Sequence, residues 1–205
     1  MPARRKKPLV IGLTGSIGMG KSATARMFAG LGIPVYDADE AVHMLYAKGG
    51  AAVPAIAKAF PEAVRNGEVV RDVLAERVAG DKAAFAKLES IVHPLVAKMR
   101  DEFLAKARGE RAELAVLDVP LLFESGGEKD VDAIVVVSAP EKVQSARVLA
   151  RPGMTRERLM VIRARQVPDA EKRAKADFVI DTGKGLGHAK AQVEAIVAAL
   201  KRQQS

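Results

Sequence analysis

The chain has 205 residues, of which 49% are apolar and 28% are charged, with a formal net charge of +8 and no cysteine. This length allows one core with an appended lobe but not two ordinary domains, and the lack of cysteine excludes disulfides, thiolate metal sites and a thiol nucleophile. No apolar stretch approaches the roughly 20 residues that cross a bilayer, so we expect a cytoplasmic protein with no membrane partner.

Half of the net charge comes from four residues near the N-terminus, Arg4, Arg5, Lys6 and Lys7. A basic balance suits a polyanion, either a nucleic acid or a phosphate-rich small molecule. Because the chain has no Trp, two Tyr and six Phe, it offers few rings for stacking on bases. We therefore expect no nucleic-acid partner and interpret the basic run as a solvated arm.

The first predicted elements are a strand, a helix and a second strand. Residues 9–13 are apolar and β-branched and stop at glycine, which predicts a buried strand. Residues 21–31 read as a helix, and residues 32–37 give a turn and a short strand. This is the opening of a βαβ unit, so we expect the two strands to pair with each other in parallel.

The middle of the chain predicts helices without a convincing strand. The predicted helices cover residues 39–46, 53–60, 72–78, 82–91 and 94–108. This run exceeds one crossover connection, which indicates an inserted helical lobe. Strands then follow at 114–119, 133–137 and 178–180, with helices at 141–150, 156–165 and 188–202. The alternation predicts an α/β fold, with a parallel sheet covered by helices on both faces.

Residues 15–22, GSIGMGKS, fit the pattern G-x-x-x-x-G-K-[ST] between a predicted strand and a predicted helix. Glycines let backbone N–H groups turn inward around phosphate oxygens, and the helix directs its own N–H groups at the same anion. Lys21 would reach the β- and γ-phosphates and Ser22 would coordinate Mg²⁺. The alternative is a glycine-rich turn that binds nothing.

A P-loop indicates a nucleoside triphosphate but not the reaction. GTPases identify guanine through an N-K-x-D segment, whereas the single asparagine, Asn66, is followed here by glycine. There is no serine-rich ABC-type signature, and the chain is small for a motor. Small-molecule kinases remain.

Two carboxylates, Asp37 and Asp39, follow the second predicted strand. Strand periodicity would place both on one face at the carboxyl edge of the sheet, beside the P-loop. One could accept the proton of an acceptor hydroxyl while the other holds Mg²⁺ through water. Alternatively Asp37 caps the next helix, with Glu40 three residues on in capping-box spacing.

Six segments in this order closely resemble the dephospho-CoA kinases: GLTGSIGMGKS, VYDAD, IVHPLV, DVPLLFE, QSARVLAR and ADFVID. Together they extend over nearly the whole chain, from Leu9 to Gly183. The resemblance implies transfer of the γ-phosphoryl group of ATP to the 3′-hydroxyl of the dephospho-CoA ribose, the final step of coenzyme A biosynthesis. ATP, Mg²⁺ and dephospho-CoA are thus the expected cofactors and substrates, and a monomer is favoured.

The resemblance also implies a single P-loop kinase domain in three parts. Its core would cover about 8–38, 112–143 and 176–205, a helical substrate lobe about 39–111, and a lid about 144–175.

Residue by residue, the resemblance implies a catalytic group and two binding sets. Asp39 would be the base, with Lys21, Arg147 and Arg151 as further catalytic residues. The nucleotide phosphates would lie on Gly15, Ser16, Ile17, Gly18, Met19, Gly20, Lys21, Ser22 and Ala23. The acceptor would lie near Asp37, Asp39, His93, Pro94, Leu121, Leu122 and Glu124.

Two of these assignments have structural alternatives. His93 could be a helix N-terminal residue, because Pro94 suits the first helical position. The PLLF stretch could be no more than core and turn, whereas Glu124 is the member of that segment to test. His43 and His188 are interpreted as surface or packing residues.

The stretch 144–151 predicts a basic lid helix. Spacings of three, four and seven residues would put Gln144, Arg147 and Arg151 on one face, with Val148 elsewhere. Pro152-Gly153 would then break the helix and give a flexible joint. The alternative is a solvated basic face.

Three positions depart from the family pattern. Ser16 and Met19 stand where glycine and serine are frequent, changes that the loop should tolerate. Thr182 replaces a frequent asparagine near the adenine, so we expect the backbone to hold the base.

Two other functions compete with this reading. One is another P-loop kinase, acting on a nucleoside monophosphate or a sugar acid. The other is a regulatory or nucleic-acid-binding ATPase.

Overall fold

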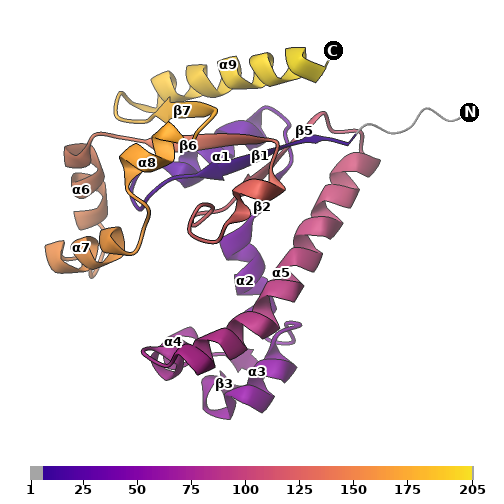
Figure 1. The fold of residues 1–205 in the computed structure, drawn as a ribbon, viewed down its shortest axis with the longest axis vertical. Helices are drawn as coiled ribbons and strands as arrows, with labels where there is room; N and C mark the ends of the chain where they lie inside the picture. Colours follow the sequence, from indigo (N-terminus) through magenta and orange to yellow (C-terminus); the bar gives the residue numbers. More distant parts are fainter. Residues whose placement is uncertain (1–6, 205) are drawn as a thin grey trace, which may run out of the picture. The chain divides into compact units, whose positions relative to one another are not determined.

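Figure 1 shows the computed structural model, which describes residues 7–204. The predicted basic arm lies outside these residues apart from Lys7. The described chain divides into two compact units, one formed by the segments up to Tyr36 and from Lys106 onward, and the other by Asp37–Ala105.

The first unit is built on a five-stranded sheet. Its strands are β1 (Leu9–Thr14), β2 (Val35–Asp37), β5 (Leu114–Asp118), β6 (Ala133–Ser138) and β7 (Phe178–Asp181), in the order β2-β5-β1-β6-β7. Its helices are α1 (Lys21–Gly30), η2 (Gly127–Asp130), α6 (Glu141–Leu149), α7 (Arg156–Ala164), α8 (Asp169–Ala174) and α9 (Leu186–Gln204).

The central strand β1 runs parallel to both of its neighbours. Leu9 is paired with Leu114 of β5, and Ile11 with Ala133 of β6; β6 in turn runs parallel to β7. The carboxyl ends of these strands therefore meet at one edge of the sheet, where ligands bind in open α/β sheets. The predicted α/β fold class is confirmed. The predicted pairing of the strands at 9–13 and 32–37 is wrong, because β5 lies between β1 and β2 in the sheet.

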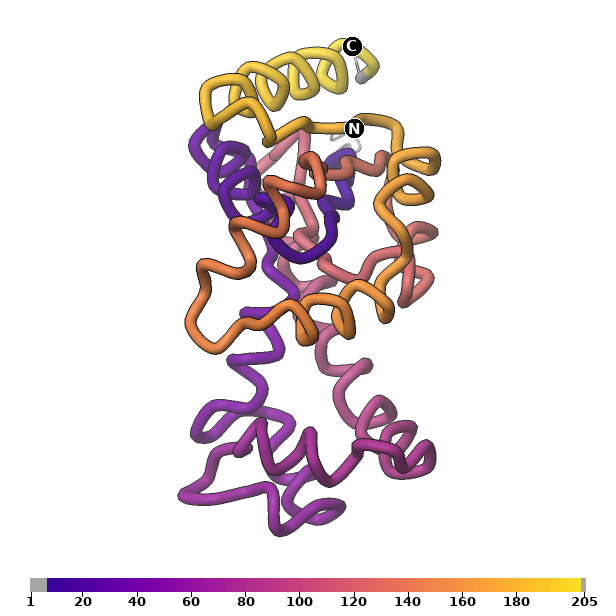
Figure 2. The backbone as a smooth tube through the Cα atoms, turned by 90° about the vertical axis from the view of Figure 1, so that its left-hand side faces the viewer, coloured from indigo at the N-terminus to yellow at the C-terminus, as the bar shows by residue number. Residues whose placement is uncertain are grey.

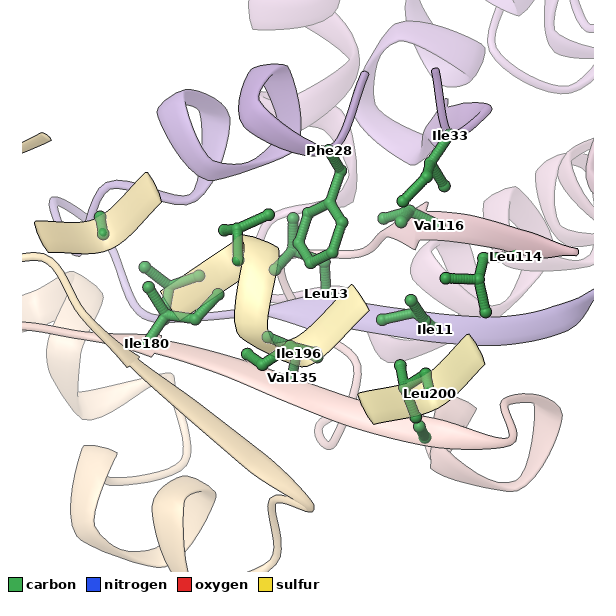
Figure 3. Packing of buried hydrophobic residues seen from close by; sticks show 14 residues of the cluster. Ile11, Leu13, Phe28, Ile33, Leu114, Val116, Val135, Ile180, Ile196 and Leu200 are labelled. Carbon is green, nitrogen blue, oxygen red and sulfur yellow. The ribbon is translucent and has the colours of Figure 1, made fainter. Parts of the chain in front are cut away.

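The core of this unit lies between the sheet and two helices. Ile11, Leu13 and Val135 on the strands are fully buried beneath Phe28 of α1 and Leu200 of α9 (Figure 3). Burial of each such side chain contributes about 1.5–3 kcal/mol. Helix α9 folds back over β7, the strand that it follows, as two views show (Figures 1 and 2). These contacts fix the sheet edge from which the functional loops leave.

The second unit is mainly helical and has a core of its own. Its elements are α2 (Ala38–Tyr46), α3 (Val53–Ala59), η1 (Pro61–Ala63), β3 (Val64–Arg65), β4 (Glu68–Val69), α4 (Arg71–Val78) and most of α5 (Lys82–Gly109). Leu45, Ile56, Phe60 and Leu74 are among the residues buried in its centre.

The prediction that this region has no strand is wrong. Strands β3 and β4 pair antiparallel, with Val64 opposite Val69. Asn66 and Gly67 between them both have positive φ, 53° and 79°, which is the backbone of a two-residue hairpin turn. The Asn-Gly pair was the available signal for this hairpin.

The predicted break before Pro94 is also wrong, because α5 is one helix of 28 residues with this proline inside it. A proline in a helix removes one backbone hydrogen bond and costs about 3 kcal/mol. Val92 is buried, and Leu95 and Val96 pack against the core of the second unit. We infer that this packing outweighs the local cost.

The sequence also missed α8, which has only six residues. Among the described residues, no helix is long and apolar enough to cross a membrane.

Candidate functional site

The P-loop connects β1 to α1, as predicted, and its glycines are needed for close approach. A Cβ on Gly15 would lie 2.6 Å from the Val137 carbonyl oxygen. A Cβ on Gly18 would lie 2.5 Å from Val148 Cγ2, and its φ is +76°. Any side chain at either position would clash, so the loop depends on glycine here.

The loop presents a row of N–H groups to an anion. Met19 N–H donates to the Ser16 carbonyl at 3.1 Å and Ile17 N–H to the Gln166 side chain at 3.1 Å. By contrast, Gly18, Gly20, Lys21 and Ser22 are among the loop residues whose N–H groups have no hydrogen-bond partner within residues 7–204. Since Lys21 opens α1, the positive end of that helix adds to the same site.

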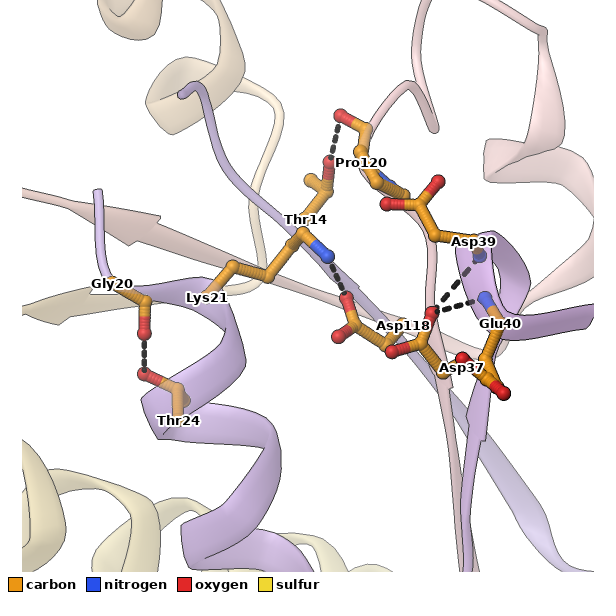
Figure 4. Close-up of polar contacts among 9 residues, drawn as sticks. All are labelled: Thr14, Gly20, Lys21, Thr24, Asp37, Asp39, Glu40, Asp118 and Pro120. Carbon is orange, nitrogen blue, oxygen red and sulfur yellow. Dashed lines mark hydrogen bonds and ion pairs between the residues drawn. The ribbon is translucent and has the colours of Figure 1, made fainter. Parts of the chain in front are cut away.

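Lys21 is held by a buried carboxylate that the sequence reading did not single out. Its Nζ lies 2.5 Å from Oδ1 of Asp118, whose side chain is 2% exposed (Figure 4). Asp118 ends β5 and is paired with Leu13 of β1, so the parallel pairing puts it beside the loop. A lone aspartate at the end of an otherwise apolar strand was the signal available in the sequence.

Arg147 of α6 is anchored rather than free. Its guanidinium donates to Thr182 Oγ1 at 2.9 Å, to the Thr182 carbonyl at 2.7 Å and to the Gly18 carbonyl at 3.5 Å. Thr182 Oγ1 also donates to the Met19 carbonyl at 2.7 Å. Arg147 and Thr182 therefore brace the P-loop together.

The predicted single basic face at 144–151 is wrong in two respects. Helix α6 ends at Leu149 and Ala150 caps it, so Arg151 lies beyond the helix, where it is exposed. Val148 shares the buried side of α6 with Gln144 and contacts Gly18, because both face the P-loop. Apolar packing against the loop sets the orientation of α6.

The two predicted carboxylates have different roles in the local fold. Asp37 ends β2 and caps α2, since its Oδ1 accepts from the N–H groups of Asp39 at 2.9 Å and Glu40 at 3.1 Å (Figure 4). The capping alternative is confirmed. Asp39 lies in the first turn of α2 and not on a strand, so strand periodicity was the wrong basis for its placement. Its side chain is exposed and forms no hydrogen bond or ion pair within the described chain.

The segment 118–124 divides between surface and interior. Leu122 is 2% exposed and is a core residue, whereas Leu121 is 46% exposed. Glu124 Oε1 accepts from Val167 N–H at 2.8 Å and lies 2.9 Å from Nζ of Lys172, which is fully buried. Burial raises the pKa of Glu124, but the hydrogen bonds from Lys172 and Val167 outweigh it and hold that pKa below its ordinary value.

His93 and Pro94 lie on the exposed side of α5. His93 is in the middle of this helix, so the helix N-terminal alternative is wrong; its Nε2 lies 3.7 Å from Glu89. His43 and His188 are exposed, as expected for surface residues.

Comparison with known proteins gives the family. A sequence model described as dephospho-CoA kinase matches residues 9–187. The chain belongs to the dephospho-CoA kinase family. Two bacterial dephospho-CoA kinases illustrate the relationship. That of Mesorhizobium japonicum is 57% identical over 95% of this chain and 98% of its own length, and that of Rhodopseudomonas palustris is 55% identical over 93% and 94%.

Solved structures share the fold of this chain. The protein TT1252 of Thermus thermophilus is 34% identical, with a TM-score of 0.85 over 95% of this chain and 98% of its own. A dephospho-CoA kinase from Campylobacter jejuni has a TM-score of 0.64 at 20% identity, over 93% and 96%, which supports the fold alone. As a member of this kinase family, the protein is an ATP-dependent phosphotransferase.

In this dephospho-CoA kinase family member, the first unit unites the P-loop with Asp118, Gln144, Arg147 and Thr182. The family departure at Met19 also has a structural use, because its sulfur accepts the N–H of Ala139 at 3.1 Å. Thr182 contacts the P-loop, because its hydroxyl donates to the Met19 carbonyl.

Proposed function

We propose that the protein transfers the γ-phosphoryl group of ATP to the 3′-hydroxyl of the dephospho-CoA ribose, with Mg²⁺. The observation that carries this proposal is a P-loop with several N–H groups that are unpartnered among the described residues, in a chain of the dephospho-CoA kinase family. Backbone donors in a loop that glycine keeps open suit a triphosphate.

Phosphate binding falls to the loop and to Lys21. The N–H groups of Gly18, Gly20 and Ser22 donate to phosphate oxygens, and the Lys21 ammonium balances their charge. Asp118 holds this ammonium at the end of β5, so the lysine is already ordered before the nucleotide arrives. Preorganised charge of this kind stabilises the transition state with little rearrangement.

The donor set also fits Mg²⁺. Ser22 presents an exposed hydroxyl in the first turn of α1, and Asp118 presents a carboxylate near the same loop. Mg²⁺ takes one or two such protein oxygens and completes its shell with phosphates and water. When bound, the ion neutralises charge on the β- and γ-phosphate oxygens.

Asp39 is the proposed base. The carboxylate of Asp37 is engaged with the N-terminal amides of α2, whereas that of Asp39 is exposed. The cap holds the helix turn that carries Asp39, and Asp39 accepts the proton of the 3′-hydroxyl as it attacks phosphorus. Asp37 thus contributes to the acceptor site by positioning Asp39.

Arg147 is assigned a structural role and Arg151 a catalytic role. Arg151 is exposed beyond the end of α6 and is the proposed contact to the γ-phosphoryl oxygens, where charge accumulates in the transition state. Arg147 acts with Thr182 on the P-loop, close to the nucleotide.

The remaining family residues are assigned to the acceptor. The exposed residues His93, Pro94 and Leu121 are proposed to contact dephospho-CoA. Leu122 and Glu124, which are also assigned to the acceptor, are proposed to hold the segment of the first unit that carries Leu121.

An acceptor panel tests the proposal. ATP with Mg²⁺ is offered separately with dephospho-CoA, adenosine, AMP, gluconate and shikimate, and products are identified by mass. We expect dephospho-CoA alone to gain one phosphoryl group at an appreciable rate. Comparable turnover of AMP or gluconate would instead assign the protein to another group of P-loop kinases.

A further inference from the structure

We propose that Gln144 and Gln166 are positioning residues for phosphoryl transfer, which hold the P-loop from outside its motif. This inference rests on the proposed function, because it concerns the loop that binds the ATP phosphates. The two glutamines come from the segment between β6 and β7, far along the chain from the loop.

Both backbone groups of Ile17 are taken by these side chains. Gln144 Nε2 donates to the Ile17 carbonyl at 2.8 Å, and Ile17 N–H donates to Gln166 Oε1 at 3.1 Å. Because a peptide bond is planar and trans, fixing the Ile17 carbonyl also fixes the direction of the Gly18 N–H. That N–H is one of the unpartnered donors in the described loop.

The loop needs this support because of its glycines. Gly18 has φ of +76° and Gly20 has φ of +96°, and glycine gains more freedom than other residues when a contact is lost. The hydrogen bonds of Gln144 and Gln166 therefore fix a backbone that the glycines of the loop would otherwise leave mobile.

The orientation of Gln144 is set by Arg163 of α7. The Arg163 guanidinium donates to Gln144 Oε1, to Ser145 Oγ at 3.0 Å and to Glu141 at 2.7 Å. Since Arg163 occupies the oxygen of the Gln144 amide, the NH₂ end faces the Ile17 carbonyl. Gln144 is 4% exposed, so loss of either hydrogen bond would leave a buried polar atom without a partner.

The position of Gln166 is set by a buried ion pair. The next residue, Val167, donates its N–H to Glu124, and the same carboxylate oxygen pairs with Lys172. A wholly buried lysine is costly unless it is paired. We infer that this pair fixes the loop that carries Gln166, so that Glu124 acts on the P-loop through Val167 and Gln166.

Gln166 offers a clean test because it borders open space. A cavity of about 470 Å³ is lined by Ser16, Gln144, Gln166 and neighbouring residues. Water can therefore reach Ile17 N–H when the Gln166 side chain no longer covers it, without collapse of the core.

The test compares Gln166→Met, which removes the acceptor oxygen, with Gln166→Glu, which keeps one. Gln203→Met is the matched control, because Gln203 is exposed on α9 and its side chain forms no hydrogen bond within the described chain. Amide exchange of Ile17 and Gly18 is measured by NMR without nucleotide, ATP dissociation constants by calorimetry, and turnover with dephospho-CoA.

In Gln166→Met we expect exchange of Ile17 N–H to rise at least tenfold, kcat to fall about 10²-fold, as loss of positioning does, and the ATP dissociation constant to rise only a few-fold. Gln166→Glu keeps slow exchange, and Gln203→Met matches the parent in every measurement. Wild-type exchange in Gln166→Met would overturn the proposal, whatever its turnover. Exchange and ATP binding need no acceptor, so this result is independent of whether dephospho-CoA proves to be the substrate.

Discussion

The P-loop and the second unit use their polar residues in different ways. Around the loop, polar groups are engaged by partners distant in sequence, as Lys21 is by Asp118 and Ile17 by Gln144. In the second unit Asp37 and His93 contact only their own helices through the bonds described, and both are exposed. We therefore propose that the loop acts through a geometry fixed in advance, whereas exposed residues such as Asp39 contact a substrate.

The largest effect is expected at the loop. Lys21→Ala removes the charge that balances the phosphates and should lower turnover by about 10³-fold or more. It also breaks a buried ion pair, which costs about 3–5 kcal/mol of unfolding free energy. Turnover, ATP affinity and urea unfolding are measured together.

A double variant separates the two losses. Lys21→Met with Asp118→Asn removes both charges, so stability should recover while turnover stays low. Recovery of turnover in the double variant would contradict a direct role of Lys21 on the phosphates. Lys142→Met, an exposed lysine of α6, serves as the control.

Asp39→Asn tests the exposed group in this comparison. We expect ATP affinity to be retained and turnover to fall roughly 10²–10⁴-fold, the scale of a positioned base. Asp37→Ala should instead cost about 1 kcal/mol of stability through the lost cap. Near-normal turnover of Asp39→Asn at saturating substrates would make Asp39 a structural residue.

The parts of the structure that the sequence predicted well are ones that a local pattern decides. The strand, loop and helix at 9–30 and the cap at Asp37 follow from spacing that a few neighbouring residues set. The hairpin at Asn66-Gly67 was missed although its signal was local. Pro94 misled the prediction, because packing of Leu95 and Val96 outweighs the preference of proline for a helix start.

Long-range partners were out of reach of the sequence. Asp118 acquires its role only when β1 and β5 pair, and Lys172 only when α8 lies beside Glu124. Gln166 likewise depends on its contact with the P-loop. Periodicity cannot report such contacts. It also extended α6 to Arg151, because nothing in the helical pattern marks the end at Leu149.

The two arginines sharpen the contrast between anchored and free groups. Arg151→Ala should lower turnover up to roughly 10³-fold with little change in ATP affinity, as for a transition-state arginine. Arg147→Ala should weaken ATP binding as well as turnover, because it releases Thr182 and the Gly18 carbonyl. Turnover and dissociation constants are compared for both. Unchanged turnover in Arg151→Ala would assign this arginine to solvent.

A pH-dependent effect is expected at Glu124. Its pKa is lower in the folded protein than its ordinary value of 4.5, so its stabilising contribution is complete above about pH 4.5 and is lost as pH falls through the folded pKa. Glu124→Gln should cost about 3 kcal/mol at pH 7, with the difference shrinking below pH 4.5. Urea unfolding at several pH values measures it, with exposed Glu171→Gln as control. A difference that persists unchanged to pH 3 would contradict the ion pair.

The position of the new phosphate on the product tests the central claim most directly. The product formed from ATP and dephospho-CoA is examined by proton–phosphorus correlation NMR. We predict a new phosphorus signal that correlates with the 3′ proton of the adenosine ribose, and much slower growth of this signal in Asp39→Asn. A phosphate on any other atom, or no phosphorylated product from the wild-type protein, would contradict the account.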